Sequence, residues 1–322
     1  MEVYVLKEPI FLQPIFKERI WGGTALQNKF GYQVPSDHTG ECWGISAHQN
    51  GQSIVREGIY KGMGLGNLYK EHPSLFGYPK PEAFPLLTKI LDANKDLSVQ
   101  VHPDDTYANV YENGELGKTE CWYIIDCKDD AEIIFGHNAN TKEEFVRMIE
   151  EKDWNKLLRR EKIKPGDFFY VPSGTIHALC EGTLVLETQQ SSDTTYRVYD
   201  YDRVDKNGNK RELHLQKAID VTMVPHKKVI RDPKIEKLQG ITVTTFVEET
   251  YFSVYKWDVK GEVELQQDKN YLLLSVIDGE AELFKDDKSY FLSKGENFIL
   301  PSNFGTFEIK GNITIIVSNS NK

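Results

Sequence analysis

A histidine that follows a proline–glycine turn is the first candidate for chemistry in this chain. The segment YVPSGTIHAL (170–179) is typical of a strand, a sharp turn and a second strand that starts near His177. Pro172 presets φ at one corner of the turn, and Gly174 tolerates the positive φ of the next, so rigid elements set the direction of the histidine. A metal ligand is held in this way, but a buried structural histidine also fits, and the segment alone leaves both interpretations open.

A second stretch, LSVQVHPDD (97–105), contains polar residues at every other position of an apolar strand. Ser98, Gln100 and His102 project from one face because side chains alternate along a strand. Packing alone would favour valine or leucine at these positions. The stretch is therefore either an exposed edge strand or one wall of a polar site.

A third stretch, GKTECW (117–122), places Lys118 and Glu120 on one face at the head of an apolar strand. A glutamate in such surroundings needs a cationic partner. Zinc accepts a mixed shell of nitrogen and oxygen ligands. The candidate ligands are Gln100, His102, Glu120 and His177.

The elements that must position these residues are mostly short strands. Segments rich in β-branched and aromatic residues, separated by Gly, Asp, Asn and Pro, predict strands at 98–101, 121–126, 131–135, 167–171, 183–188, 241–246 and 271–277. Helical patterns are few: 141–160, opened by a capping box of Thr141 and Glu144, and a weaker one at 212–221. This pattern favours a mainly β fold of the sandwich or barrel type.

An internal repeat predicts two β-domains. KPGDFFYVPSGTIHAL (164–179) is echoed by SKGENFILPSNFGTFEI (293–309), and YIIDCKDDAEIIF (123–135) by LLSVIDGEAELF (273–284), in the same order. The polar, proline-bearing stretch 224–240 separates the copies, so we predict domains at 1–235 and 236–322. Thr306 stands where the first copy has His177, which assigns any metal site to the N-terminal domain.

These motifs together resemble a known family. The spacing Gly166-x₅-Pro172-x-Gly174-x₂-His177 matches the second motif of the cupin superfamily. The ordered set QVHPDD, GKTECW, VPSGTIHAL and LETQQSSDTTYR, with RIWGG (19–23) near the start, resembles the short bacterial type I mannose-6-phosphate isomerases over essentially the whole chain. The resemblance implies two cupin-type jelly-roll domains, and one zinc ion held in the N-terminal domain by Gln100, His102, Glu120 and His177.

The resemblance also implies roles for other residues. Arg197 matches the catalytic arginine of the family, and Lys118, Glu187 and Asp193 match its acid–base candidates. Lys89 and Ser98 match residues implicated in phosphate binding, and Trp21 of RIWGG is a candidate pocket wall. Many relatives read His-Lys-Pro-Glu where this chain reads Gly-Lys-Thr-Glu (117–120), so a role of that histidine in proton transfer does not carry over and the base is left open.

Taken singly, each of these residues also has a structural interpretation. Arg197 could be a solvated strand residue, Glu187 a buried paired carboxylate and Trp21 part of the core. The sequence does not separate these alternatives.

The activity implied is the interconversion of mannose 6-phosphate and fructose 6-phosphate through an enediol, with zinc as a Lewis acid. Two alternatives stay open. One is an Fe(II) cupin oxygenase, which the glutamine at a ligand position disfavours. The other is a non-catalytic sugar-binding cupin.

Composition limits the partners. The chain has 322 residues and a net charge of −10, which argues against nucleic acid and against an anionic membrane surface. Its four cysteines form no C-x-x-C pair, the first ten residues lack the apolar region of a secretory signal, and no run is long enough to span a membrane. We therefore expect a cytoplasmic protein with a small sugar phosphate as its partner. Its oligomeric state does not follow from the sequence.

Overall fold

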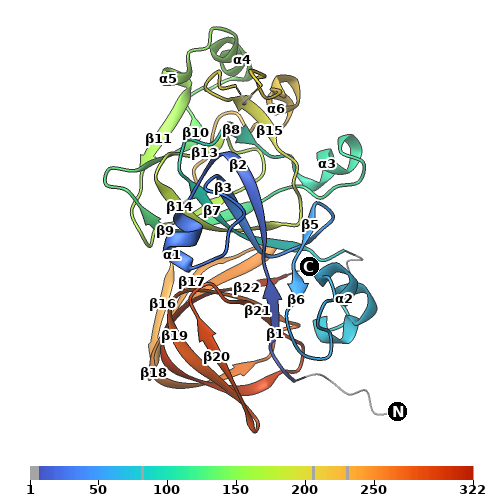
Figure 1. Cartoon of the computed structure of the whole chain (residues 1–322). Helices are drawn as coiled ribbons and strands as arrows, with labels where there is room; N and C mark the ends of the chain where they lie inside the picture. The colour runs from blue at the N-terminus through green and yellow to red at the C-terminus, as the bar shows by residue number, and fades with distance from the viewer. Residues whose placement is uncertain (1–6, 81–82, 205–206, 230–231, 322) are drawn as a thin grey trace.

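Two β-rich bodies, one above the other in Figure 1, make up the computed structural model, which describes residues 7–80, 83–204, 207–229 and 232–321. Strands predominate in both bodies and the helices are short. The prediction of a mainly β chain with a few short helices is confirmed.

The upper body is built from two sheets that face each other. The six-stranded sheet runs in the order β12 (Phe168–Val171), β9 (Glu120–Cys127), β14 (Thr183–Gln190), β7 (Leu86–Ala93), β3 (Thr39–Ile45) and β2 (Ile15–Gly23). The five-stranded sheet runs in the order β11 (Leu158–Lys162), β10 (Glu132–His137), β13 (His177–Leu179), β8 (Val99–Val101) and β15 (Tyr196–Tyr199). An apolar cluster that includes Leu91 and Trp122 from one sheet and Phe135 and Leu179 from the other fills part of the space between them.

Strand β8 is central, not an edge. It pairs with β13 on one side and β15 on the other. Val99 and Val101 are fully buried in a cluster shared with helices on the outside of the sheet, so the alternate residue Gln100 faces the other way, toward the opposing sheet. The interpretation of 98–101 as an exposed edge strand is therefore wrong.

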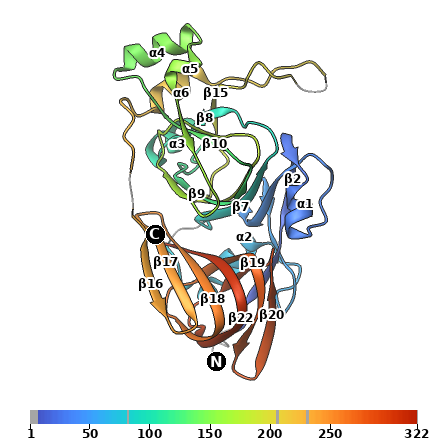
Figure 2. The ribbon, with the colours of Figure 1, turned by 90° about the vertical axis from the view of Figure 1, so that its left-hand side faces the viewer.

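Helices cover the outer side of the five-stranded sheet. In Figure 2, α4, α5 and α6 gather at the end of the upper body that is far from the lower one. Their bounds are Lys142–Glu150 for α4, Trp154–Leu157 for α5 and Leu215–Val221 for α6. One further helix, α3 (Asp105–Tyr111), follows β8.

The helix predicted at 141–160 is shorter than expected. The Thr141 hydroxyl accepts from Glu144 N as predicted, but α4 ends at Glu150 because Lys152 takes a left-handed φ of 55°. Residues 158–162 then pair with β10 as a strand. The second predicted helix begins at Leu215 instead of 212, because Glu212 and His214 form hydrogen bonds with Arg197.

The lower body is a nine-stranded sheet that also receives strands from the start of the chain. Its main path is β16 (Lys234–Leu238), β17 (Ile241–Glu248), β18 (Phe252–Gln267), β22 (Gly305–Ser320), β19 (Leu272–Lys285), β21 (Asn297–Leu300), β1 (Ile10–Gln13) and β6 (Ile54–Val55), with β20 (Lys288–Ser293) on β19. The division between residues 235 and 236 stays a prediction. It falls inside β16, and β1 and β6 pair within the C-terminal sheet.

The remaining elements are short helices and one hairpin. They are α1 (Ala25–Phe30), the hairpin of β4 (Ala47–His48) and β5 (Gly51–Gln52), α2 (Leu65–Glu71) and the 3₁₀ helix Pro73–Phe76. No helix in the described part of the chain has the length and apolar character needed to span a membrane.

The internal repeat is visible in matching backbone hydrogen bonds. Gly166 and Gly295 have φ values of 92° and 95°, in the region that favours glycine. Gly166 N donates to Ile124 O at 2.9 Å, and Gly295 N donates to Val276 O at the same distance. The two turns therefore attach to the same place in the two copies.

Candidate metal centre and its cavity

The turn before His177 joins it to the first histidine. Gly174 has a φ of 81°, and its N donates to His102 O at 2.8 Å. A Cβ at this position would lie 2.9 Å from Val221 O, so a larger residue would be strained in both backbone and packing. The glycine predicted for the turn is thus needed to hold the two histidine-bearing segments together.

Strand register places a row of candidate residues across the five-stranded sheet. His177 on β13 is directly opposite Gln100 on β8, and Gln100 is directly opposite Arg197 on β15. Residues directly opposite in antiparallel strands share a face, so the row lies on the face that looks toward the other sheet.

Glu120 on the opposing sheet lies between the two histidines. His102 Nε2 is 3.4 Å from Glu120 Oε2, and His177 Nε2 is 3.4 Å from Glu120 Oε1. The exposed fraction of each of the three residues is 1%. Among the described residues they are the group of His, Cys, Asp or Glu arranged to hold a metal ion, with one ligand atom from each within 4.8 Å of the others.

Backbone carbonyls orient both imidazoles. His102 Nδ1 lies 2.9 Å from Thr194 O, and His177 Nδ1 lies 2.8 Å from Thr175 O. Because only a protonated nitrogen can donate to a carbonyl, Nδ1 carries the proton in each neutral ring. The lone pair of Nε2 then faces Glu120, which is the second-shell arrangement typical of metal-binding histidines.

Unpaired buried atoms show that these residues fit a metal ion. Glu120 Oε1 and His177 Nε2 have no hydrogen-bond partner among the described residues, although buried polar atoms are normally paired. The protonation states fit as well. Burial lowers the pKa of His177 and, with the charge of Lys118, lowers that of His102 to about 3. Burial alone would raise the pKa of Glu120, but Lys118 and the two histidines hold it well below its usual value. Two neutral imidazoles and a carboxylate are the forms that bind zinc.

Charged side chains of alternating sign extend from this cluster across the six-stranded sheet. Lys118 Nζ lies 2.9 Å from Glu120 Oε2 and 3.9 Å from Glu187 Oε1. Lys89 Nζ lies 3.7 Å from the same Glu187 oxygen. All four residues are buried, so each charge depends on its neighbours in the row for stabilisation.

Glu187 and Asp193 differ in environment. Trp122 Nε1 donates to Glu187 Oε2 at 3.0 Å, and burial together with the charge of Glu120 raises the pKa of Glu187. Burial favours a higher pKa for Asp193 too, but the charge of Lys89 and a hydrogen bond from Asn50 lower it overall. The surroundings therefore move the two pKa values in opposite directions, that of Glu187 up and that of Asp193 down.

Most of the predicted site residues line one cavity of about 470 Å³ beside the cluster. Those that line it are Trp21, Lys89, Ser98, Gln100, Lys118, Glu187, Asp193 and Arg197. Trp21 is 4% exposed and packs with Leu91 and Leu97, so it is both core and pocket wall.

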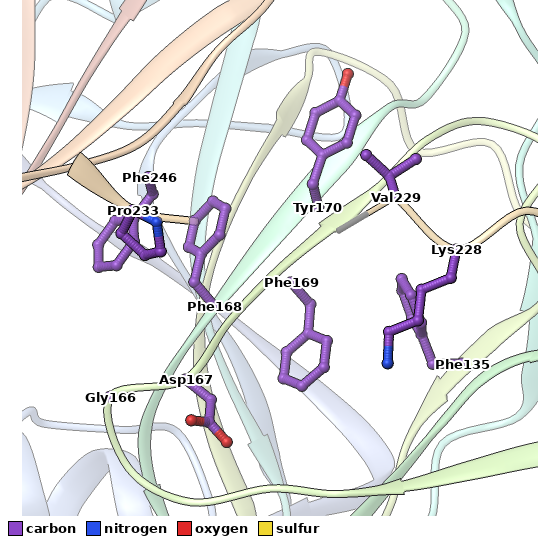
Figure 3. Close-up of a pocket in the computed structure, with 10 residues that line it drawn as sticks. All are labelled: Phe135, Gly166, Asp167, Phe168, Phe169, Tyr170, Lys228, Val229, Pro233 and Phe246. Carbon is purple, nitrogen blue, oxygen red and sulfur yellow. The ribbon is translucent and has the colours of Figure 1, made fainter. Parts of the chain in front are cut away.

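A second cavity, of about 300 Å³, lies between β12, β17 and Lys228 (Figure 3). Aromatic rings line it, with Phe168 stacked on Phe246, and it contains none of the predicted site residues.

Arg197 and Ser98 form a pair at the cavity wall. Arg197 Nε donates to Ser98 Oγ at 3.2 Å, and Nη1 donates to Glu212 O at 2.9 Å. Ser98 and Lys89, the two residues expected to bind phosphate, therefore have different neighbours in the cavity wall. Ser98 contacts Arg197, whereas Lys89 lies beside Glu187 and over the ring of Trp43.

Four further charged residues of the cavity wall escaped the sequence analysis: Glu18, Arg19, Glu41 and Arg211. Glu41 accepts from Arg19 Nε at 2.7 Å and from Trp43 Nε1 at 2.6 Å, and Arg19 and Glu41 both line the cavity. Arg211 lines it as well. Arg19 stands directly before the IWGG part of the quoted motif, and Glu41 stands two residues before a tryptophan, but neither spacing predicts their contact across β2 and β3.

Comparison with known proteins agrees with this geometry. A family model described as phosphomannose isomerase type I, catalytic domain, matches residues 10–151, and one described as mannose-6-phosphate isomerase, cupin domain, matches residues 242–320. The mannose-6-phosphate isomerase ManA of Bacillus subtilis is 58% identical over 311 residues, which is 97% of this chain and 98% of that protein. The chain belongs to the type I mannose-6-phosphate isomerase family. A mannose-6-phosphate isomerase of Streptococcus mutans is 52% identical over 98% of this chain and all of that protein.

Solved structures of the family have the same fold. The crystal structure of mannose 6-phosphate isomerase from Bacillus subtilis is 59% identical, with a TM-score of 0.95 over 97% of this chain and 99% of that one. A phosphomannose isomerase from Salmonella typhimurium matches with a TM-score of 0.79 at 15% identity over 98% of this chain and all of that one, which shows the fold alone. The predicted family and its cupin fold are thereby confirmed.

Proposed function

We propose that this protein is a zinc-dependent isomerase that interconverts mannose 6-phosphate and fructose 6-phosphate through an enediol. The observation that carries the proposal is the buried cluster of His102, Glu120 and His177, whose unpaired ligand atoms lie beside a cavity lined by acid–base and cationic groups. The relatives from Bacillus subtilis and Streptococcus mutans carry the same activity in their names.

The ligands proposed for one zinc ion per chain are Gln100, His102, Glu120 and His177. When bound, zinc supplies a Lewis acid that polarises the sugar carbonyl and stabilises negative charge on its oxygen. The polar atoms without partners, Glu120 Oε1 and His177 Nε2, support the assignment of these two residues, and strand register supports that of Gln100.

Two residues of the charged row suit the proton transfers. Trp122 fixes one oxygen of Glu187, so the other oxygen is the atom available to take a proton from carbon. Burial alone would lower the pKa of Lys118, but the charges of Glu120 and Glu187 raise it, so Lys118 stays protonated and can donate a hydrogen bond to a substrate oxygen as negative charge develops there. Asp193, with its lowered pKa, serves better as an anion that orients neighbouring cations.

The remaining cavity residues suit substrate binding. Ser98, Lys89 and Arg197 place donors on the cavity wall, and arginine favours forked contacts to phosphate. Trp21 offers an apolar surface to the sugar. The proposal includes the cytoplasmic location expected from the sequence.

Removal of the metal should abolish turnover and lower the melting temperature. A ligand present at 1,000 times its Kd contributes about 4 kcal/mol to folding, which for a domain of this size is a decrease on the order of 10 °C when it is lost. Dialysis against a chelator, followed by assay and thermal melting with and without added Zn²⁺, checks this. A chelated protein with full activity would contradict the proposal. Oxygen consumption that depends on Fe(II) would support the oxygenase, and sugar binding without turnover would support the binding protein.

Lys89→Ala should mainly raise KM for mannose 6-phosphate, by about tenfold, because one charge-assisted contact to phosphate is lost. Lys17→Ala is the matched control, since Lys17 lies over the same Trp43 ring but does not line the cavity. Steady-state kinetics of both variants decide the role. A lower kcat at unchanged KM would show that Lys89 acts through Glu187 and does not anchor phosphate.

A further inference from the structure

Asp105 is a half-buried carboxylate that holds the segment leading to the proposed ligand Glu120. It is the first residue of α3. Its Oδ1 accepts a hydrogen bond from Gly117 N at 2.9 Å. A Cβ on Gly117 would lie 2.4 Å from Asp105 N, so the two stretches of backbone touch and no larger residue fits without a shift. The carboxylate therefore fixes the start of the segment 117–120, which also carries Lys118.

Gln190 holds the same segment at a second point. Its Nε2 donates to Asp105 Oδ1 at 2.8 Å, and its Oε1 accepts from Thr119 N at 2.9 Å. The two partners define the orientation of the amide, because its NH₂ only donates and its oxygen only accepts. Gln190 is 3% exposed and ends β14, the strand that carries Glu187. The backbone is thus anchored on both sides of Lys118.

Tyr251 brings the lower body into this network. It lies between β17 and β18, packed against an apolar cluster that contains Cys121 of the upper body and Phe252 of the lower one. Burial raises the pKa of Tyr251, and the charge of Asp105 and a hydrogen bond between the two side chains raise it further. A phenol hydroxyl is the donor toward an ionised carboxylate, so Tyr251 links Asp105 to the lower body.

A shift of the segment 117–120 would move two proposed catalytic groups together. Lys118 Nζ lies 2.9 Å from Glu120 Oε2, so the proposed donor to the substrate and the proposed zinc ligand move as a pair. The residues proposed to bind the substrate are on other strands, Lys89 on β7 and Arg197 on β15. Displacement of the segment should therefore affect zinc and the chemical step more than substrate binding.

We propose that Asp105 positions Lys118 and Glu120 for catalysis. Gln190 fixes this carboxylate from β14, and Tyr251 gives the lower body a part in the active site. The inference rests on the proposed function, since it takes a zinc ligand and a substrate donor from the segment that Asp105 holds. Asp105 does not line the cavity, so it is a positioning residue.

The first test compares Asp105→Ala and Asp105→Asn with the parent protein. The matched control is Asp104→Ala, because Asp104 is the adjacent carboxylate and its Oδ1 accepts from Tyr107 N at 2.8 Å to cap α3. Competition with a chromophoric chelator measures zinc affinity. Steady-state kinetics of the zinc-loaded proteins give kcat and KM for mannose 6-phosphate, and thermal melting shows that each variant is folded.

Removal of a group that supports a metal ligand predicts that Asp105→Ala loses about 10- to 100-fold in zinc affinity and in kcat, with KM changed by less than about threefold. Asp105→Asn keeps one oxygen for Gly117 N and Gln190 Nε2 and should recover most of the loss. Asp104→Ala should melt at a lower temperature but keep its zinc affinity and kcat within about twofold, because it loses only a helix cap. Normal zinc affinity and kcat in a folded Asp105→Ala, or an equal loss in Asp104→Ala, would overturn the inference.

The second test isolates the contribution of the lower body. Tyr251→Phe removes only the hydroxyl and should lower kcat by about three- to tenfold in the parent but have no further effect in Asp105→Ala, because the two residues act as a unit. Tyr255→Phe is the matched control, since Tyr255 donates to Glu248 Oε1 at 3.0 Å within the lower body. Additive effects of Tyr251→Phe and Asp105→Ala would overturn the role of the lower body. Failure of the parent to turn over mannose 6-phosphate would instead overturn the proposed function, and the zinc affinities would still decide the role of Asp105.

Discussion

His102→Ala and His177→Ala should each lose bound zinc and isomerase activity together. Removal of a group that only supports a metal ligand costs 10–100-fold in metal affinity or activity, so removal of a ligand itself should cost more than about 100-fold. Each histidine is 1% exposed and points Nε2 at Glu120, so no solvent-exposed group can take its place without rearrangement. Zinc content and kcat, measured on the same sample, check this.

His137→Ala is the control for these two variants. His137 is 2% exposed in the same body, and its Nε2 lies 2.9 Å from Met223 O, away from the metal cluster. This variant should be less stable but should keep its zinc. Full zinc occupancy in both His102→Ala and His177→Ala would show that the proposed ligands are wrong.

Arg197→Lys should lower kcat by about 10²–10³, with zinc content unchanged. The variant keeps a positive charge but loses the fork that now contacts Ser98 Oγ and Glu212 O, and lysine does not replace arginine at a site with two directed contacts. Loss of one preorganised donor that stabilises charge in the transition state typically costs this much. Kinetics and metal analysis of the variant beside the parent measure both quantities.

Arg160→Lys, on β11 at the edge of the same sheet, makes the matched change outside the cavity and should leave kcat within about twofold. A near-normal kcat in Arg197→Lys with only KM raised would reduce Arg197 to a binding residue. Its role as a catalytic residue would then be withdrawn.

The metal cluster could be predicted because its residues lie in short strands with strong local signals. The turn at Pro172 and Gly174 and the alternation of Ser98, Gln100 and His102 are both local, and two-residue periodicity gives the face of a strand without knowledge of its partners. The resemblance to a family then predicted that these segments, which are far apart in the sequence, form one site. Local patterns cannot predict such a contact.

The charged wall of the cavity could not be predicted in the same way. The pair of Arg19 and Glu41 depends on the register between β2 and β3, and that register shifts twice along the pair of strands. Asp200 and Arg211 meet through an irregular hairpin whose start includes left-handed φ values at Tyr201 and Asp202. No periodic pattern encodes such contacts.

Two features of the fold that the local pattern did not predict have tertiary causes. The apolar face at 141–160 continues into residues that pair with β10, so strand pairing overrode helical periodicity after Glu150. Residues 10–13 lie inside the predicted N-terminal domain (1–235) but pair with β21 in the sheet of the lower body, a long-range pairing without a local signal.

The most direct test is one coupled assay of mannose 6-phosphate turnover by the purified full chain, with zinc counted in the same sample. The account predicts about one zinc per chain, because Thr306 replaces the ligand histidine in the second copy, and a kcat in the ordinary range of roughly 1–10³ s⁻¹. Activity should rise in proportion to the zinc bound. A fully zinc-loaded protein that does not turn over mannose 6-phosphate, or turnover that is independent of zinc content, would contradict it.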